Sequence, residues 1–249
     1  MKRLIAALLL TATPAMSFDI QSMSDTEKAA FGEAVREYLM ANPEVLIESI
    51  NVLEERRAAD SAQNDQALVA ANRDAIFDDG HSWIGGNPDG DLTIVEFIDY
   101  RCGVCRRFND EVHKVVEEDG NIRLIVKEFP ILGQDSEASA RFAVAVKQIA
   151  GDDAYRKAHD ELIALRSSAS IEALTGVAEK IGVDADEVIN TMNTEDVTAV
   201  LRENHQLAER MAIQGTPTFV IGDELLRGVP QAGLTKSVQQ IRADMADQG

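Results

Sequence analysis

The chain has 249 residues, of which 24 are lysine or arginine and 43 are aspartate or glutamate, so its formal net charge is −19 at pH 7. Such acidity argues against nucleic acid or an anionic membrane surface as the main partner. The length allows one full domain and a smaller second one.

The first residues predict a cleaved secretory signal peptide. Lys2 and Arg3 form a short positive region, an apolar stretch follows, and the small residues at 15 and 17 favour cleavage after Ser17. A membrane anchor is the weaker alternative, because the apolar stretch is shorter than the about 20 residues that a spanning helix needs. We expect residues 1–17 to be removed, which leaves a soluble periplasmic chain of 232 residues with a net charge of −21.

Residues 18–77 are predicted to form a helical N-terminal arm. Apolar residues recur there at helical spacing and form one stripe: Phe31, Val35, Leu39, Leu46, Ile50 and Leu53. Asn42 and Pro43 interrupt the pattern and are typical of the start of a second helix. A polar tract follows at 54–74. The stripe either packs on the main domain or joins copies of the chain, and the polar tract favours self-association as a homodimer or homotrimer.

Residues 78–249 are predicted to form the main domain. Its start, 81–91, is rich in turn residues. Residues 92–100 are β-branched or aromatic on both parities, which predicts a strand buried on both faces. Further along, the pattern predicts a helix from about Cys102, a strand within 121–131, a helical block at about 135–211, a hairpin at 216–228 and a final helix at 231–247. The fold class is therefore α/β. We expect breaks in the helical block near Gly151, at 167–170 and at 182–184.

The chain contains only two cysteines, Cys102 and Cys105, and they directly follow the first predicted strand. At the start of a helix the free N–H groups and the dipole stabilise an anion, and thiol pKa values in such motifs fall to about 3.5–7.5. We expect Cys102 to be the exposed nucleophile and Cys105, one turn later, to be the shielded resolving thiol. A structural disulfide would close too small a loop to stabilise much.

A zinc site is the other alternative, and it lacks a second cysteine pair. The histidines are spread along the chain, and each is expected to be a surface or packing residue: His81, His113, His159 and His205. We therefore expect neither a metal nor a cofactor.

Glu96 has the same strand parity as its apolar neighbours in the first predicted strand. A carboxylate there is costly unless it is protonated or paired. Burial would raise its pKa and suit it to general acid–base work. Lys127, on the next predicted strand, either pairs with Glu96 or extends to solvent. Arg101, Arg106 and Arg107 bring positive charge that is expected to lower the thiol pKa further, and a solvated helix face is the alternative for Arg106 and Arg107.

Two stretches resemble the DsbA family of thioredoxin-fold thiol–disulfide oxidoreductases: TIVEFIDYRCGVCRRF at 93–108 and GTPTFVIGD at 215–223. The resemblance covers residues 82–247 and implies a thioredoxin fold with an inserted helical block. The stretch EYLMANPEVLIESINVLEERR at 37–57 is similar to the leading segment of ScsC-like proteins, members of this family that are associated with copper tolerance and can oligomerise.

The resemblance implies dithiol–disulfide exchange with unfolded or misfolded secreted proteins, and a membrane redox partner that reoxidises or reduces the pair. It makes Thr216 and Pro217 a cis-proline loop, whose backbone hydrogen-bonds a substrate strand beside Cys102. It also makes Glu96 the acid that moves protons to and from Cys105.

The direction of exchange stays open at this point. Gly103 and Val104 differ from the Pro-His pair of strongly oxidising DsbA proteins. Gly103 resembles the glycine that follows the first cysteine in the Cys-Gly-Tyr-Cys motif of disulfide isomerases. Disulfide oxidase and disulfide isomerase or reductase are both compatible with the residues. A Cu(I)-binding protein that uses the two thiolates as soft ligands is the alternative from a different class.

Overall fold

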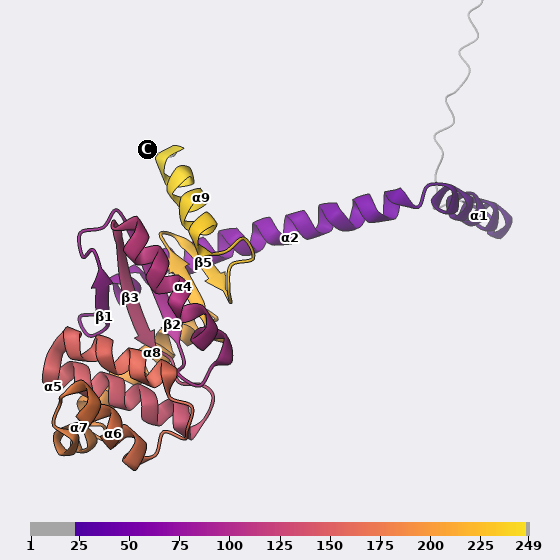
Figure 1. Cartoon of the computed structure of the whole chain (residues 1–249). Helices are drawn as coiled ribbons and strands as arrows, with labels where there is room; N and C mark the ends of the chain where they lie inside the picture. The colour runs from indigo at the N-terminus through magenta and orange to yellow at the C-terminus, as the bar shows by residue number, and fades with distance from the viewer. Residues whose placement is uncertain (1–22, 248–249) are drawn as a thin grey trace, which may run out of the picture. The chain divides into compact units, whose positions relative to one another are not determined.

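The structure is a computed structural model, and it describes residues 23–247 (Figure 1). The predicted signal peptide, residues 1–17, lies outside the described residues. The chain divides into two compact units, Met1–Ala58 and Ala59–Gly249. Within residues 23–247, no helix combines the length and the apolar character that crossing a bilayer requires.

The first unit contains helix α1 (Asp25–Ala41) and the first part of helix α2 (Glu44–Ala71). A capping box begins α1, in which the Ser24 hydroxyl accepts from the Glu27 amide while the Ser24 amide donates to the Glu27 carboxylate at 2.8 Å. Asn42 ends α1 by donating to Tyr38 O. No residue of α1 is buried, and most of the apolar stripe is exposed, with Ile50 at 50%.

The second unit contains a five-stranded sheet in the order β1-β3-β2-β4-β5. The strands are β1 (Trp83–Gly86), β2 (Leu92–Ile98), β3 (Ile122–Glu128), β4 (Thr218–Ile221) and β5 (Glu224–Arg227). Strands β2 and β3 are parallel, and all other neighbours are antiparallel. The predicted hairpin is confirmed, because β4 and β5 pair across the turn at Gly222 and Asp223.

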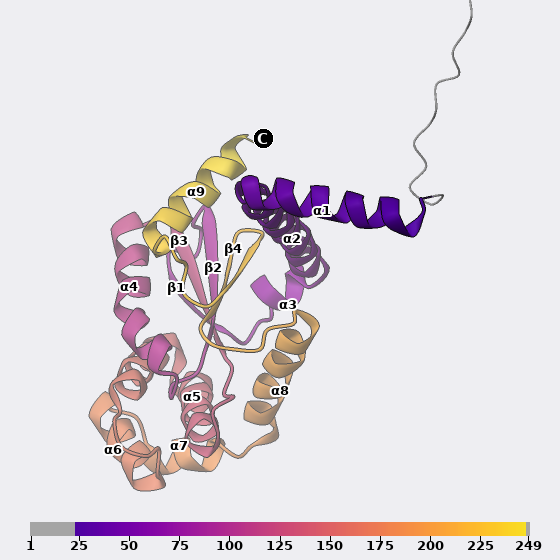
Figure 2. The ribbon, with the colours of Figure 1, turned by 90° about the vertical axis from the view of Figure 1, so that its right-hand side faces the viewer.

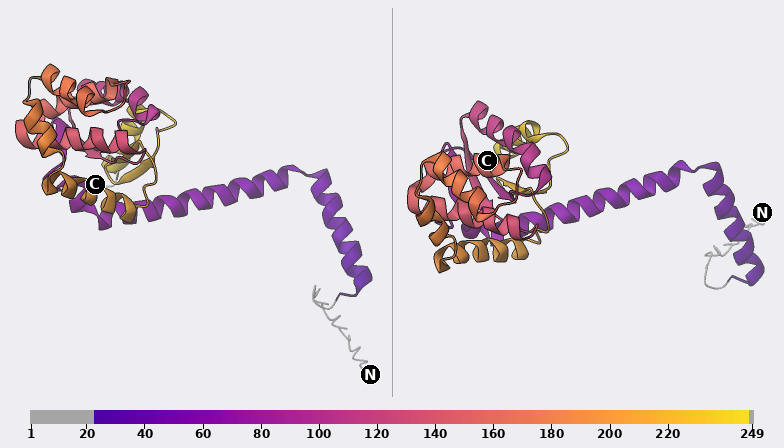
Figure 3. Two further views of the ribbon diagram at one scale, coloured as in Figure 1. Left: turned by 90° about the horizontal axis from the view of Figure 1, so that it is seen from below. Right: turned by 60° about the horizontal axis from the view of Figure 1, so that its bottom comes forward.

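The remaining helices are α3 (Arg73–Phe77), α4 (Gly103–Asp119), α5 (Gln134–Ala164), α6 (Ile171–Ile181), α7 (Ala185–Thr191), α8 (Glu195–Arg210) and α9 (Leu234–Asp247). Helices α4 and α9 lie on one side of the sheet and α3 and α8 on the other (Figure 2). Helices α5 to α8 come between β3 and β4 in the chain, and α5, α6 and α7 gather into one block (Figure 3). The α/β class, the inserted helical block and the helical arm are thus confirmed. The predicted break at Gly151 is present, with φ of 79°.

Two apolar clusters explain why β2 is apolar on both parities. Ile94 and Ile98 belong to the cluster that includes side chains of α4 and α9, whereas Val95 and Phe97 belong to the cluster that includes side chains of α3 and α8. The predicted burial of this strand on both faces is confirmed. The carboxyl end of β2 leads into the turn that carries the cysteines, so a rigid strand positions them.

Strand β1 lies in the segment that the sequence predicts to be only turns. Its two glycines account for the difference. A Cβ on Gly85 would lie 2.1 Å from the Trp83 ring, and Gly86 has φ of 68°. The absence of side chains lets the Trp83 ring lie over the strand, where its Nε1 donates to Asp152 O at 3.0 Å. These glycines serve close packing within a strand.

Candidate active site

The turn between β2 and α4 is shaped by Asp99. Its Oδ1 accepts from the Arg101 amide at 2.7 Å, and its Oδ2 accepts from the Ile131 and Leu132 amides at 2.8 and 3.0 Å. These bonds tie the cysteine turn to the loop that follows β3. Cys102 then serves as the N-cap residue of α4, and its Sγ lies 3.4 Å from the Cys105 amide.

Both cysteines are free thiols in the structure, and their surroundings differ. Burial raises the pKa of Cys102, but hydrogen bonding with Thr216 and with the amides of Cys105 and Val104 outweighs it, so the pKa is lowered. Burial raises the pKa of the Cys105 thiol, and the charge of Glu96 raises it further. Cys102, which we predicted to be exposed, is only 6% exposed.

The loop before β4 lies against Cys102, whose Sγ donates to Thr216 O at 3.2 Å. The Thr216–Pro217 peptide bond is cis, as the resemblance implied. Partly exposed apolar side chains belong to the segments that adjoin this contact: Val104, Ile131, Leu132 and Val229. Val104 lies in the first turn of α4, and Val229 follows Gly228, whose amide donates to Pro217 O at 3.0 Å. Apolar side chains are therefore exposed on the segments that adjoin Cys102.

Glu96 is 2% exposed, and its Oε1 has no hydrogen-bond partner among the described residues. Burial raises its pKa to about 8. Its charge contributes to the raised pKa of Cys105, so the two groups lie within electrostatic reach of each other. A carboxyl group that is largely protonated at neutral pH is suited to exchange a proton with a neighbouring thiol.

Both expectations for Lys127 were wrong. The parallel register aligns Lys127 with Phe97 and Glu96 with Val126, so the lysine and Glu96 lie on opposite faces of the sheet. Lys127 is fully buried and pairs with Asp79, a residue that precedes β1. Burial raises the pKa of Asp79, but the charge of Lys127 and the hydrogen bonds from Lys127 and Ser82 together outweigh it, and the pKa falls to about 2.

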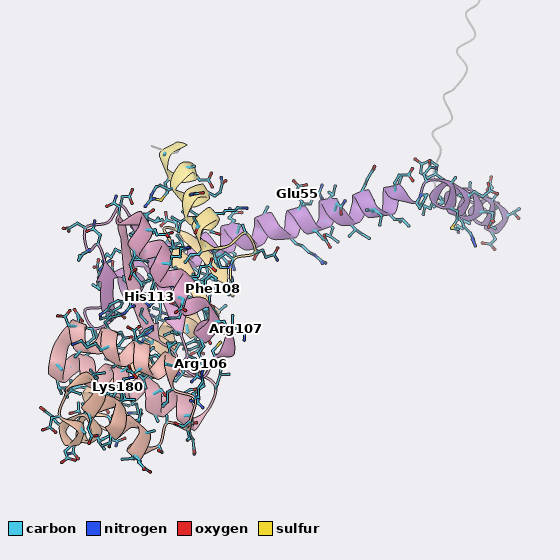
Figure 4. All side chains as sticks on the ribbon, viewed as in Figure 1. Glu55, Arg106, Arg107, Phe108, His113 and Lys180 are labelled. Atoms are coloured by element: carbon cyan, nitrogen blue, oxygen red, sulfur yellow. The ribbon has the colours of Figure 1, made fainter. Side chains whose placement is uncertain are left out.

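The arginines near the cysteines hold the helical block in place. Arg106 donates to Tyr100 O at 2.6 Å and to Leu165 O at 2.7 Å, and Arg101 donates to Ser167 O at 2.8 Å. Figure 4 shows Arg106 and Arg107 near the start of α4. The solvated face that we allowed for Arg106 was wrong, whereas Arg107 is exposed. The leading causes of the lowered pKa of Cys102 include hydrogen bonds and no arginine.

A buried polar network that the sequence analysis missed lies at the end of β3. Glu128 Oε1 accepts from Tyr100 OH at 2.8 Å and from Tyr155 OH at 2.5 Å. Tyr100 OH also lies 3.2 Å from His159 Nδ1, and His159 Nε2 lies 2.9 Å from Asn109 Oδ1. Burial raises the pKa of Glu128 to about 8. Glu128 shares its parity with apolar residues of β3, the same signal that identified Glu96.

One cluster offers ligand atoms within 4.8 Å of one another, from His113, His159 and Asp160. The guanidinium of Arg156 lies 3.0 Å from Nε2 of His113, and both ring nitrogens of His159 lie within hydrogen-bond distance of neighbours. The guanidinium cation beside His113, and the neighbours that already engage both ring nitrogens of His159, make this cluster a poor metal site. His113 and His159, which are distant in sequence, therefore lie against each other as packing residues.

A family model described as a DSBA-like thioredoxin domain matches residues 93–238. The chain belongs to the DsbA-like thioredoxin family. The thioredoxin fold that the resemblance implied is confirmed. A second model, the N-terminal domain of the copper resistance protein ScsC, matches residues 27–60, and so the resemblance of the arm is confirmed as well.

Solved structures of DsbA-like proteins agree with this assignment. A thioredoxin-like oxidoreductase from Silicibacter pomeroyi is 35% identical with a TM-score of 0.62, and the match covers 72% of this chain and 99% of that one. ScsC of Proteus mirabilis in a transitional conformation is 27% identical with a TM-score of 0.65, and the match covers 91% and 100%.

Curated relatives differ in how much of their length this chain covers. The probable disulfide bond formation protein D of Bacillus anthracis is 24% identical over 152 residues, which are 56% of this chain and 69% of that protein. The Na⁺/H⁺ antiporter NhaA 1 of Salinispora arenicola is 26% identical over 166 residues, but the chain spans only a quarter of its length, 25%.

Proposed function

We propose that this DsbA-like protein is a periplasmic thiol–disulfide oxidoreductase, which exchanges disulfides with unfolded or misfolded secreted proteins through Cys102 and Cys105. The family match places the chain among thiol–disulfide oxidoreductases. The observation that carries the proposal is the contrast between the two thiols: an N-cap thiol with a lowered pKa stands one turn from a buried thiol with a raised pKa.

This contrast gives each thiol one role. In the oxidised protein, a substrate thiolate attacks the Cys102 sulfur and breaks the bond between the two cysteines. Cys105 leaves with the electron pair and takes a proton from Glu96. A second substrate thiolate then attacks the substrate sulfur of the mixed disulfide, and Cys102 leaves as a thiolate. A thiol with a low pKa leaves faster, which favours this last step.

The reverse reaction uses the same groups. The Cys102 thiolate attacks a substrate disulfide and one substrate thiolate leaves. Glu96 accepts the proton of Cys105, and the Cys105 thiolate attacks the Cys102 sulfur and releases the reduced substrate. An isomerase needs only the first attack and a second attack by another thiol of the same substrate, so it recovers its Cys102 thiolate without net oxidation.

Substrate selection is expected to depend on chain flexibility and apolar character. Exposed apolar side chains such as Leu132 and Val229 come from segments that adjoin Cys102 and Pro217. Unfolded secreted proteins expose apolar side chains and free main-chain groups, and the backbone of Thr216 can pair with such an extended segment. A folded protein offers neither. The predicted signal peptide supports a location where substrate thiols oxidise.

The arm favours an assembled isomerase over a monomeric oxidase. Phe31 of α1 and Leu46, Ile50 and Leu53 of α2 are 45–50% exposed although they are large and apolar. Burial of such a side chain from full exposure stabilises by about 1.5–3 kcal/mol, and about half of that remains to be gained here in an assembly. Copies of the arm that share one core would bring several redox sites to one mispaired substrate. We propose a homodimer or homotrimer with a membrane redox partner that keeps the pair reduced.

The Cu(I) alternative gains one point of support, because the model that matches residues 27–60 belongs to a copper resistance protein. That match does not include the cysteines. Titration of the reduced protein with Cu(I) distinguishes Cu(I) binding from thiol–disulfide exchange. If Cu(I) binds tightly and the protein shows no thiol exchange, the copper function replaces the redox one.

The decisive experiment measures exchange by the mature chain and by two single variants. We expect the wild type to rearrange a scrambled disulfide substrate faster than it oxidises a reduced one. Cys102→Ser should abolish both activities, and Cys105→Ser should accumulate mixed disulfides with substrate. Absence of trapped mixed disulfides with Cys105→Ser would overturn the assigned roles.

Sedimentation of the same protein tests the assembly. Ile50→Glu places a charge in the stripe and should yield a monomer that retains thiol exchange but loses isomerase activity. Asn51→Glu, at an adjacent exposed position outside the stripe, is the matched control and should remain assembled. A wild type that sediments as a monomer at tens of micromolar excludes the assembly and favours an oxidase.

A further inference from the structure

Two buried carboxyl groups lie on the same face of the sheet, and the mechanism above uses only one of them. The parallel register pairs Glu96 with Val126 and Ile98 with Glu128, so the two acids are diagonal neighbours on adjacent strands. They are 2% and 3% exposed. Oε1 of Glu96 and Oε2 of Glu128 are both buried without a hydrogen-bond partner among the described residues.

We propose that Glu128 is a positioning residue for proton transfer at Cys105, because Glu128 and Glu96 together carry at most one negative charge near neutral pH and Glu128 so controls whether Glu96 holds a proton. The proposal rests on the role of Glu96 in the proposed function. Two like charges in one desolvated site repel each other strongly, so the second proton leaves at a higher pH than the first. Burial raises the pKa of each acid to about 8, and the charge of Glu96 adds to the rise at Glu128.

The hydrogen bonds of the two acids differ, and this difference decides where the charge rests. The hydroxyls of Tyr100 and Tyr155 both donate to Glu128, and such bonds favour a carboxylate. Glu96 has no comparable donors at its buried Oε1. When the pair loses its first proton, the charge therefore rests on Glu128, and Glu96 keeps its proton for the leaving Cys105 thiolate. When Glu96 must instead accept the proton of Cys105, it first passes its own proton to the Glu128 carboxylate, so the pair keeps one negative charge and that charge now lies on Glu96.

Other titratable groups surround Glu128. The hydroxyls of Tyr100, from the turn after β2, and Tyr155, from α5, donate hydrogen bonds to Glu128. The negative charges of Asp99 and Glu96 act on Glu128 through space. His159 of α5 contacts Tyr100, and the charges of His113 and Arg156 act on His159. Burial lowers the pKa of His159, so this histidine stays neutral and leaves the charge to the carboxyl groups.

The test is a carboxyl-carbon NMR titration of the reduced mature chain, carried out for the wild type, Glu128→Gln and Glu96→Gln. In the wild type we expect each acid to titrate in two steps. Glu128→Gln should reduce the Glu96 titration to one step and lower its midpoint by about one pH unit, the scale at which coupled sites become distinguishable. Linkage is reciprocal, so Glu96→Gln should lower the Glu128 midpoint by the same amount.

A second variant keeps the test decisive if Glu128→Gln does not fold. Tyr155→Phe keeps the ring, which stacks on Trp83 with centroids 5.6 Å apart, and removes only the hydroxyl that donates to Glu128. Glu128 then holds its proton to higher pH, so the Glu96 midpoint should fall in the same direction as in Glu128→Gln. Exposed Glu179→Gln is the control and should leave the Glu96 titration unchanged.

The pH profile for Cys105-dependent release of substrate from its mixed disulfide with Cys102 gives the functional readout, and its midpoint should follow the Glu96 titration in every variant. A Glu96 titration that is unchanged in both Glu128→Gln and Tyr155→Phe overturns the proposal. If the NMR shifts are reciprocal but the pH profile of release does not follow the Glu96 titration, the role of Glu128 in proton transfer is also overturned, and the proposed thiol exchange is unaffected. A chain with reciprocal shifts and no exchange at all retains the coupling and refutes the proposed function.

Discussion

Replacement of Glu96 by glutamine should change how the stability of the reduced protein depends on pH. The pKa of this carboxyl group is about 8 in the folded chain, against an ordinary value of 4.5. The two values differ by 3.5 units, and each unit corresponds to about 1.4 kcal/mol. The free energy of unfolding at pH 8 is therefore about 5 kcal/mol lower than it would be if residue 96 did not ionise in the unfolded chain. Few single side chains in a native domain have so large an effect.

The sign follows from the proton count. Below pH 4.5 the acid is protonated in both states and contributes no pH dependence. Between 4.5 and about 8 the unfolded chain ionises while the folded chain keeps its proton, so the wild type loses stability as the pH rises. Glutamine carries no such proton. Glu96→Gln should therefore show a shallower decline in this window, by up to about 1.4 kcal/mol per pH unit.

Urea unfolding of the reduced protein from pH 4.5 to 8.5 measures this difference directly. The buried amide of glutamine has its own desolvation cost of about 1–3 kcal/mol, but that cost is the same at every pH, so the slopes are compared and not the absolute values. Exposed Glu179→Gln should run parallel to the wild type. If Glu96→Gln also runs parallel, Glu96 is ionised in the folded chain and the proton-transfer role fails with it.

Two further predictions concern the thiols and the buried ion pair. Iodoacetamide at about pH 6 should label Cys102 of the reduced protein before Cys105, because the pKa of the first thiol is lowered and that of the second is raised; mass spectrometry that finds Cys105 labelled first contradicts the assignment. Lys127→Met should lower the free energy of unfolding by about 3–5 kcal/mol, since it leaves the half-buried Asp79 without its charged partner. The double variant with Asp79→Asn should recover most of that loss in urea unfolding, and a double variant as unstable as Lys127→Met alone would show that the pair is not the cause.

The parts of the site that the sequence predicted correctly depend on neighbours along the chain. The position of Cys102 as an N-cap follows from a strand that ends at Ile98 and a helix that begins at Gly103. The burial of Glu96 follows from strand parity, and two-sided burial of β2 follows from its apolar residues. Each of these features depends on residues that are close to one another in the sequence, so a single sequence is enough to predict it.

The parts that the sequence analysis missed depend on register and on tertiary packing. Lys127 is close to Glu96 in any alignment of the two strands, but a register that pairs Lys127 with Phe97 moves it to the other face. A shift of one residue would have placed the two charges together. The partners of Glu128 come from the turn after β2 and from α5, which lies beyond it in the chain. No local pattern brings Tyr100 and Tyr155 to one carboxyl oxygen.

The helical insertion therefore contributes to the chemistry as well as to the fold. Its residues Tyr155 and His159 complete the hydrogen bonding around Glu128, and its carbonyls at Leu165 and Ser167 accept from the arginines beside Cys102. A thioredoxin sheet alone supplies the strand, the cysteine turn and one buried acid. With the insertion in place, the second acid gains two tyrosine donors, and the charge of the buried pair has a defined position when the resolving thiol gains or loses its proton.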